Sequence, residues 1–147
     1  MINVVFTGSY EHTLDPKGRL ILPAKFREQF QAGGYLTQPT GQCLALFTRP
    51  VFDEVAAMHR ERQRTGEEAV ANQARGFFSR SFEFVPDSQG RIAVPQVLRD
   101  KVGIDREVTV IGNSTRVEIW DRERWALEDA QQDIRINEQF QGRDISF

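Results

Sequence analysis

Cysteine and histidine are scarce in this chain of 147 residues, which has one cysteine and two histidines. A single cysteine cannot form a disulfide within the chain, and Cys43, His12 and His59 do not have the spacing of a zinc site. No apolar run approaches the roughly 20 residues that a membrane-spanning helix needs. Residues 1–6 lack the basic start and long apolar stretch of a signal peptide. We therefore expect a cytoplasmic protein with no metal, no cofactor and no membrane partner.

An excess of positive charge is also missing, since the net charge is −2 and the isoelectric point is about 5.7. Nucleic-acid-binding domains are usually basic, so the total charge alone argues against that class. The charge is unevenly distributed, however. Residues 1–49 hold five basic and three acidic side chains, whereas residues 126–147 hold two basic and five acidic ones. A locally basic surface can coexist with an acidic tail, so a nucleic-acid partner is not excluded.

Most of the chain is an internal duplication. Residues 15–27 and 87–99 share the pattern Asp-x-x-Gly-Arg followed by Pro and Arg, with five identities in 13 positions at an offset of 72. A second block, residues 44–52, matches residues 117–125 at an offset of 73. Two matching blocks at almost the same offset indicate that one unit has been copied.

Each copy has the pattern of a strand, a tight turn, a second strand, a short helix, a hairpin and a closing helix. Asp15 and Gly18 suit the first and fourth positions of a type I turn, and Asp87 and Gly90 repeat this arrangement. A proline after the second strand of each copy suits the start of a helix. Residues 67–79 predict a further, amphipathic helix that connects the copies.

These elements predict an α+β fold that is mainly β. Two tandem ββαββα units, related by pseudo-two-fold symmetry, would share one small β-barrel-like core with short helices, and both motif turns would lie on one surface. The first unit spans residues 1–65, and the connecting helix with the second unit spans residues 66–130. A polar, acidic C-terminal tail over residues 131–147 would follow.

The paired motifs resemble the MraZ family, which comprises bacterial transcriptional regulators associated with the division and cell-wall gene cluster. The resemblance covers roughly residues 6–130 and is specific because two motifs occur in tandem. It implies AbrB-like (SpoVT-AbrB) units, a ring-like homo-oligomer and a nucleoid-associated protein. The partner would be double-stranded DNA, as direct repeats upstream of its own operon, with no small-molecule substrate.

The resemblance further implies that the Asp-x-x-x-Arg surface contacts DNA. Asp15, Lys17 and Arg19 then form the first contact site, and repeat symmetry adds Asp87 and Arg91. Residues 15–27 carry a charge of +3 and residues 87–99 a charge of +1. The first copy, with Lys25 as an additional basic group, is therefore expected to carry the main DNA contact.

Simpler roles for the same residues stay open. Arg19 and Arg91 could each form a salt bridge that fixes the turn, and this is compatible with a DNA contact. Asp15 and Asp87 suit turn-starting positions, and Lys25, like Arg27 and Arg99, could be a surface charge on a short helix.

Other classes of function are also considered. One alternative is a protein-interaction module that docks a partner through the same Asp/Arg surface. We predict that the chain is not an enzyme, because no Ser/His/Asp series, phosphate-binding Gly loop or metal cluster is present in the sequence. Asp15 and Asp87 would also be poor acids, because each has an arginine close by that lowers its pKa.

Overall fold

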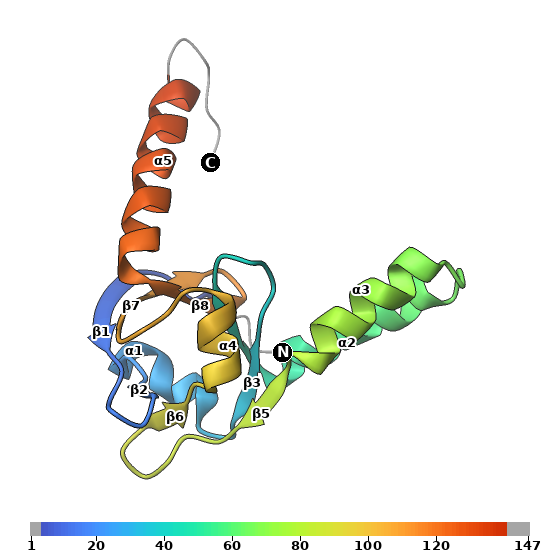
Figure 1. The fold of residues 1–147 in the computed structure, drawn as a ribbon, viewed down its shortest axis with the longest axis horizontal. Coiled ribbons are helices and arrows are strands. Elements are labelled where there is room, and N and C mark those ends of the chain that lie inside the picture. Colours follow the sequence, from blue (N-terminus) through green and yellow to red (C-terminus); the bar gives the residue numbers. More distant parts are fainter. Residues whose placement is uncertain (1–3, 141–147) are drawn as a thin grey trace.

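The computed structural model describes residues 4–140 as an α+β fold that consists mainly of antiparallel β-structure (Figure 1). The first copy and the connection comprise β1 (Ser9–Thr13), β2 (Arg19–Ile21), α1 (Ala24–Arg27), the 3-10 helix η1 (Glu28–Phe30), β3 (Gly34–Thr37), β4 (Leu44–Thr48), α2 (Arg49–Gln63) and α3 (Glu68–Ser79). The second copy comprises β5 (Phe82–Phe84), β6 (Arg91–Ala93), α4 (Gln96–Lys101), β7 (Glu107–Asn113), β8 (Arg116–Asp121) and α5 (Arg122–Phe140). The predicted ββαββα order is thus confirmed in both copies, with α3 between them.

The strands of the two copies alternate within one large sheet. Its order is β1-β7-β8-β4-β3-β5, and β2 pairs with β6 in a separate two-stranded ribbon. Each outer strand pairs with the other copy, β1 with β7 and β5 with β3, while β4 and β8 join the copies at the centre. The predicted hairpins β3–β4 and β7–β8 are both present. Strand pairing thus gives a sheet and a ribbon and does not by itself close a barrel.

Both copies contribute to one hydrophobic core, as the sequence predicts. Leu20 and Leu22 of the first copy and Ile92 and Val94 of the second copy are at most 2% exposed and belong to the same cluster. Leu20 and Ile92 are register partners in the β2–β6 ribbon, so they point to the same side of it. Burying such a side chain contributes about 1.5–3 kcal/mol. The ribbon that carries both motifs is therefore anchored by its inner face.

Two helical arms extend from this body (Figure 1). One is the α2–α3 hairpin, in which Phe52 packs against Phe77 and Phe78. These aromatic contacts hold α2 and α3 against each other. The other arm is α5, and Asp121 caps its start, because Asp121 Oδ2 accepts a hydrogen bond from the Arg124 N–H at 3.0 Å.

The C-terminal region differs from its prediction. Residues 131–140 continue α5 and do not begin a separate tail. The segment has no glycine or proline and is rich in good helix formers, so its polarity reflects exposure to water and not the absence of a helix. The rest of the predicted tail lies outside the described residues. Within residues 4–140, no helix is both long and apolar enough to cross a membrane.

Candidate nucleic-acid interface

The first motif forms a tight turn organised by one carboxylate. Asp15 Oδ1 accepts hydrogen bonds from the backbone N–H groups of Lys17 and Arg19, both at 2.9 Å. Asp15 Oδ2 accepts a third bond from Arg19 Nε at 2.6 Å. The Gly18 N–H donates to the Asp15 carbonyl at 2.9 Å, which closes the predicted four-residue turn, and Gly18 has φ +74°. Asp15 therefore sets both the turn and the direction of the Arg19 side chain.

The second motif repeats this arrangement. Asp87 Oδ1 accepts from the N–H groups of Gln89 and Arg91 at 2.9 Å, and Asp87 Oδ2 accepts from Arg91 Nε at 2.7 Å. The Gly90 N–H donates to the Asp87 carbonyl at 2.9 Å, and Gly90 has φ +77°. A left-handed φ of this kind favours glycine. The duplicated sequence therefore produces two turns with the same hydrogen bonds.

These bonds lower the pKa of both aspartates. For Asp15 the largest cause is the backbone N–H of Arg19, and the Arg19 side chain adds to it. For Asp87 the pKa is lowered in the same way, first by the backbone N–H of Arg91. The predicted direction is confirmed, although the main cause is a backbone donor and not the arginine charge. Both carboxylates are thus suited to orienting donors and poorly suited to giving up a proton.

The β2–β6 ribbon brings the two half-buried motif arginines onto its outer face. Arg19 is opposite Ala93, and Ile21 is opposite Arg91, so Arg19 and Arg91 are diagonal neighbours on the same side. The other side carries the buried residue Leu20, whereas Ile21 is 48% exposed. Two arginines that are 72 positions apart in the sequence therefore share one surface.

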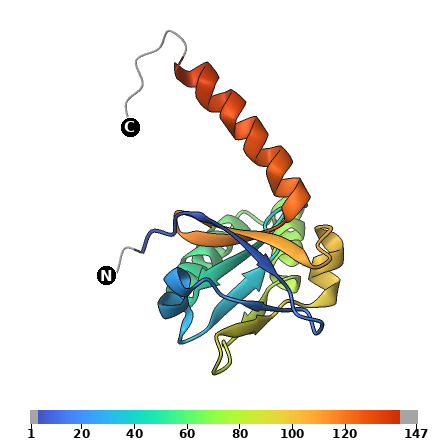
Figure 2. The same cartoon turned by 90° about the vertical axis from the view of Figure 1, so that its left-hand side faces the viewer.

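The donor groups of this surface are only partly used. Among the described residues, the terminal nitrogens of Arg19 and Arg91 have no hydrogen-bond partner, and only Nε of each is bound to its aspartate. The salt-bridge interpretation and the ligand-binding interpretation thus coexist. The exposed Lys17 lies at the tip of the first turn, where Gln89 lies in the second. Both turns are at the end of the body opposite α5 (Figures 1 and 2).

Comparison with known proteins shows which family the sequence matches. The sequence model described as "MraZ protein, putative antitoxin-like" matches residues 5–73 and 77–142, one segment for each copy. The chain belongs to the MraZ family.

Two relatives with the family's name match most of the chain. A protein of Salinispora arenicola named transcriptional regulator MraZ is 45% identical over 121 residues, which cover 82% of this chain and 84% of that protein. A protein of Micrococcus luteus with the same name is 43% identical over 134 residues, which cover 91% of this chain and 93% of that protein. The resemblance seen in the motifs therefore extends over the whole fold.

Lys25 is placed less centrally than the other predicted site residues. Its Nζ donates to Thr7 Oγ1 at 3.3 Å, and Thr7 precedes β1. Hydrogen bonds between described residues thus link Lys25 to the N-terminal segment and not to either turn. The structure brings the other five predicted residues together in the two turns of the ribbon: Asp15, Lys17 and Arg19 in the first, and Asp87 and Arg91 in the second. It gives Lys25 no comparable connection.

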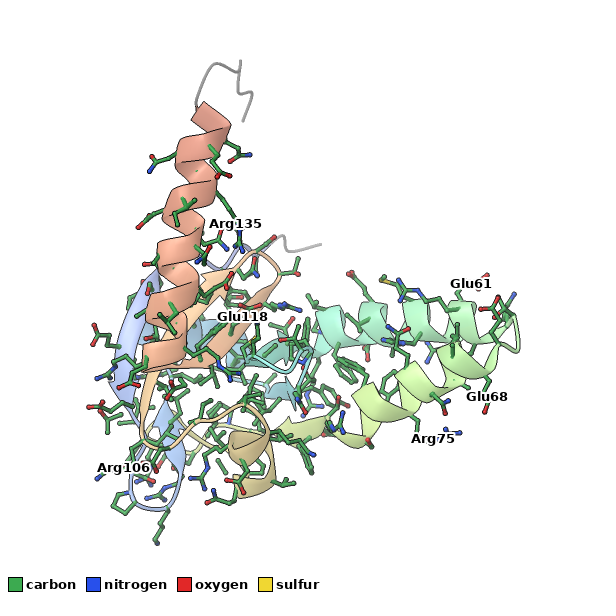
Figure 3. The ribbon with its side chains drawn as sticks, turned by 45° about the horizontal axis from the view of Figure 1, so that its top comes forward. Glu61, Glu68, Arg75, Arg106, Glu118 and Arg135 are labelled. Carbon is green, nitrogen blue, oxygen red and sulfur yellow. The ribbon has the colours of Figure 1, made fainter. Side chains whose placement is uncertain are left out.

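Three basic residues near the turns were not predicted as part of the site. Arg99 approaches Gly18 of the first turn, and Arg27 approaches Gly90 of the second turn. Arg106 lies beside the first turn, because its carbonyl accepts a hydrogen bond from the Leu14 N–H at 2.8 Å (Figure 3). All three arginines lie outside the two turns in the sequence. The only sequence signal for Arg27 and Arg99 is that each recurs in the repeated motif together with the glycine of the turn.

Proposed function

We propose that this member of the MraZ family is a sequence-specific DNA-binding regulator of transcription. Its contact surface would be the outer face of the β2–β6 ribbon together with the two motif turns. The observation that carries the proposal is that Arg19 and Arg91 share the outer face of the ribbon. Each is held by its aspartate, and the terminal nitrogens of both have no protein partner among the described residues. The names of the relatives, transcriptional regulators, agree with it.

The chemistry of the surface fits recognition of a duplex. An arginine whose Nε is bound to a carboxylate still presents its terminal donors, which can contact guanine O6 and N7 in the major groove or a phosphate. Lys17 at the turn tip suits a phosphate, a contact that positions the protein without reading sequence. Asp15 and Asp87 act as orienting residues for the arginines.

Local charge explains how an acidic chain can bind a polyanion. The two turns and the arginines that approach them comprise five basic side chains and two acidic ones: Lys17, Arg19, Arg27, Arg91 and Arg99 against Asp15 and Asp87. The chain as a whole has a net charge of −2. Of the 21 acidic side chains of the chain, only Asp15 and Asp87 belong to this set, so the set carries a net positive charge and attracts phosphates.

The same proposal includes assembly and target. The two copies would be AbrB-like units related by a pseudo-two-fold axis, which is supported by the sheet order, since exchanging each strand for its counterpart reverses that order. Several subunits in a ring would place many turns along direct repeats, so weak single contacts would add up through effective concentration. The target would lie upstream of the chain's own operon in the division and cell-wall gene cluster, within the nucleoid.

A gel-shift titration with the DNA directly upstream of the gene tests this function. A duplex of the same composition in scrambled order is the matched control, and the solution mass of the protein is measured in parallel. We expect retardation of the upstream duplex at lower protein concentration, by an assembly of several subunits. Equal affinity for both duplexes would contradict sequence-specific binding. Capture of a stable protein partner without DNA retardation would favour the protein-interaction module instead.

A further inference from the structure

Each motif turn is contacted by an arginine from the other copy. At the first turn, the Val94 N–H donates to the Gly18 carbonyl at 3.0 Å, and the Val94 carbonyl accepts from Arg99 Nε at 2.9 Å. The Arg99 guanidinium then lies against Gly18, where a Cβ would be 2.6 Å from Arg99 Nη2. A loop of the first copy is thus held by a side chain of α4, which belongs to the second copy.

The second turn shows the reciprocal contacts. The Leu22 N–H donates to the Gly90 carbonyl at 3.0 Å, and Arg27 Nη2 donates to the Leu22 carbonyl at 2.9 Å. A Cβ on Gly90 would be 2.6 Å from Arg27 Nε, and this nitrogen is buried and has no hydrogen-bond partner among the described residues. The same chain of contacts thus occurs twice, each time from one copy to the other.

These contacts differ in effect from the hydrogen bonds of the aspartates. Asp15 and Asp87 fix the internal shape of each turn, since all their bonds go to residues within four positions. The orientation of the turn relative to the body depends on groups outside it. A planar guanidinium that lies along the glycine at the fourth turn position restricts this orientation, and any larger residue there would displace it.

We propose that Arg99 is a positioning residue for the first turn and Arg27 a positioning residue for the second. Each arginine would hold the opposite copy's turn in the orientation that presents its contact residues, Arg19 in one turn and Arg91 in the other. This inference rests on the proposed DNA-binding function for its consequence, but its structural part can be tested without DNA.

Hydrogen–deuterium exchange followed by mass spectrometry tests the positioning directly. The amides of Lys17, Gly18 and Arg19 are all hydrogen-bonded, so a peptide over residues 14–20 reports on the first turn, and residues 86–92 report on the second. We expect Arg99→Ala to speed exchange about tenfold over residues 14–20 and to leave residues 86–92 unchanged. Arg27→Ala, the matched control, should do the reverse.

Two further results keep this test decisive. Arg99→Lys retains the positive charge without the planar group, so exchange over residues 14–20 should stay fast. If Arg99→Ala instead speeds exchange in the turn of its own copy, or in both turns equally, the proposal is overturned. Peptides from the central strands β4 and β8 show whether a variant has lost the fold as a whole. If Arg99→Ala has lost it, Arg99→Lys takes its place in the comparison.

A double-mutant cycle on DNA affinity tests the consequence. If the two residues are coupled, the loss of DNA affinity in the double variant Arg99→Ala, Arg19→Ala should not equal the product of the losses in the two single variants. We expect the two values to differ about threefold or more. Arg99→Ala combined with Arg91→Ala should agree with that product within about twofold. The opposite pattern would overturn the inference. If neither Arg19→Ala nor Arg91→Ala weakens binding, the proposed function fails, and the exchange measurement alone decides the positioning role.

Discussion

The residues at the tips of the two motif turns differ in charge and can be exchanged by mutation. Lys17 and Gln89 occupy equivalent places in turns with matching hydrogen bonds, so Lys17→Gln makes the first turn resemble the second. Gln89→Lys makes the second turn resemble the first. Because neither side chain has a hydrogen-bond partner among the described residues, both substitutions should leave the fold intact and change only the charge presented to DNA.

The expected change in the salt dependence of DNA affinity follows from one phosphate contact for each turn. A lysine that neutralises one phosphate contributes about 0.9 to the slope of the logarithm of affinity against the logarithm of salt concentration. Between 50 and 200 mM salt, one such contact corresponds to a change in affinity of about 3.5-fold for each bound subunit. Lys17→Gln should therefore reduce the slope by about 0.9 for each bound subunit, and Gln89→Lys should increase it by the same amount.

Fluorescence anisotropy titrations at several salt concentrations measure these slopes, with upstream and scrambled duplexes in parallel. The ratio of the two affinities should not change, since phosphate contacts carry no sequence information. A Lys17→Gln variant with an unaltered slope would refute the phosphate contact at the first turn. An unaltered slope for Gln89→Lys would show that the second turn does not lie on the DNA backbone.

Two predictions concern stability. Glu118 is 4% exposed and accepts a hydrogen bond from Arg116 Nε at 2.9 Å, so Arg116→Ala should lower the free energy of unfolding by about 2 kcal/mol in urea titrations. The exposed Arg64→Ala is the control and should cost at most about 0.5 kcal/mol, and equal effects would contradict a buried ion pair. The lowered pKa of Asp15 and Asp87 adds stability that is present above the unfolded pKa, near 3.8, and lost as the pH falls through the lower folded pKa. Asp15→Asn with Asp87→Asn should flatten the stability curve below about pH 4, and an unaltered curve would refute this linkage.

The features that were predictable from the sequence are local ones. The turn at Asp15 and Gly18 closes within four residues, and its side-chain and glycine preferences are fixed by those positions alone. Leu20 and Leu22, two positions apart, likewise indicate the inner face of β2, and both are buried. Both patterns recur in the second copy, so each copy has a strand with one apolar face. A shared core is predictable because both apolar faces must be buried away from water.

The contacts between the copies depend on strand pairing, which the sequence did not specify. Arg99 reaches Gly18 only because β2 pairs with β6. The charge around each turn therefore cannot be obtained by summing residues 15–27 separately from residues 87–99. The polar composition of residues 131–140 does not distinguish a tail from an exposed helix, because a helix that extends away from the body has the same composition.

The most direct test of the central claim is the ratio of affinities for the upstream duplex and the scrambled duplex, measured for the wild-type chain, Arg19→Ala and Arg91→Ala. If both arginines contact base edges, each substitution should lower this ratio by about 5- to 150-fold, the range expected for the loss of one bidentate contact. Arg64→Ala, on the distant α2 arm, should leave the ratio unchanged. A ratio unaffected by both Arg19→Ala and Arg91→Ala would contradict DNA recognition through the β2–β6 face.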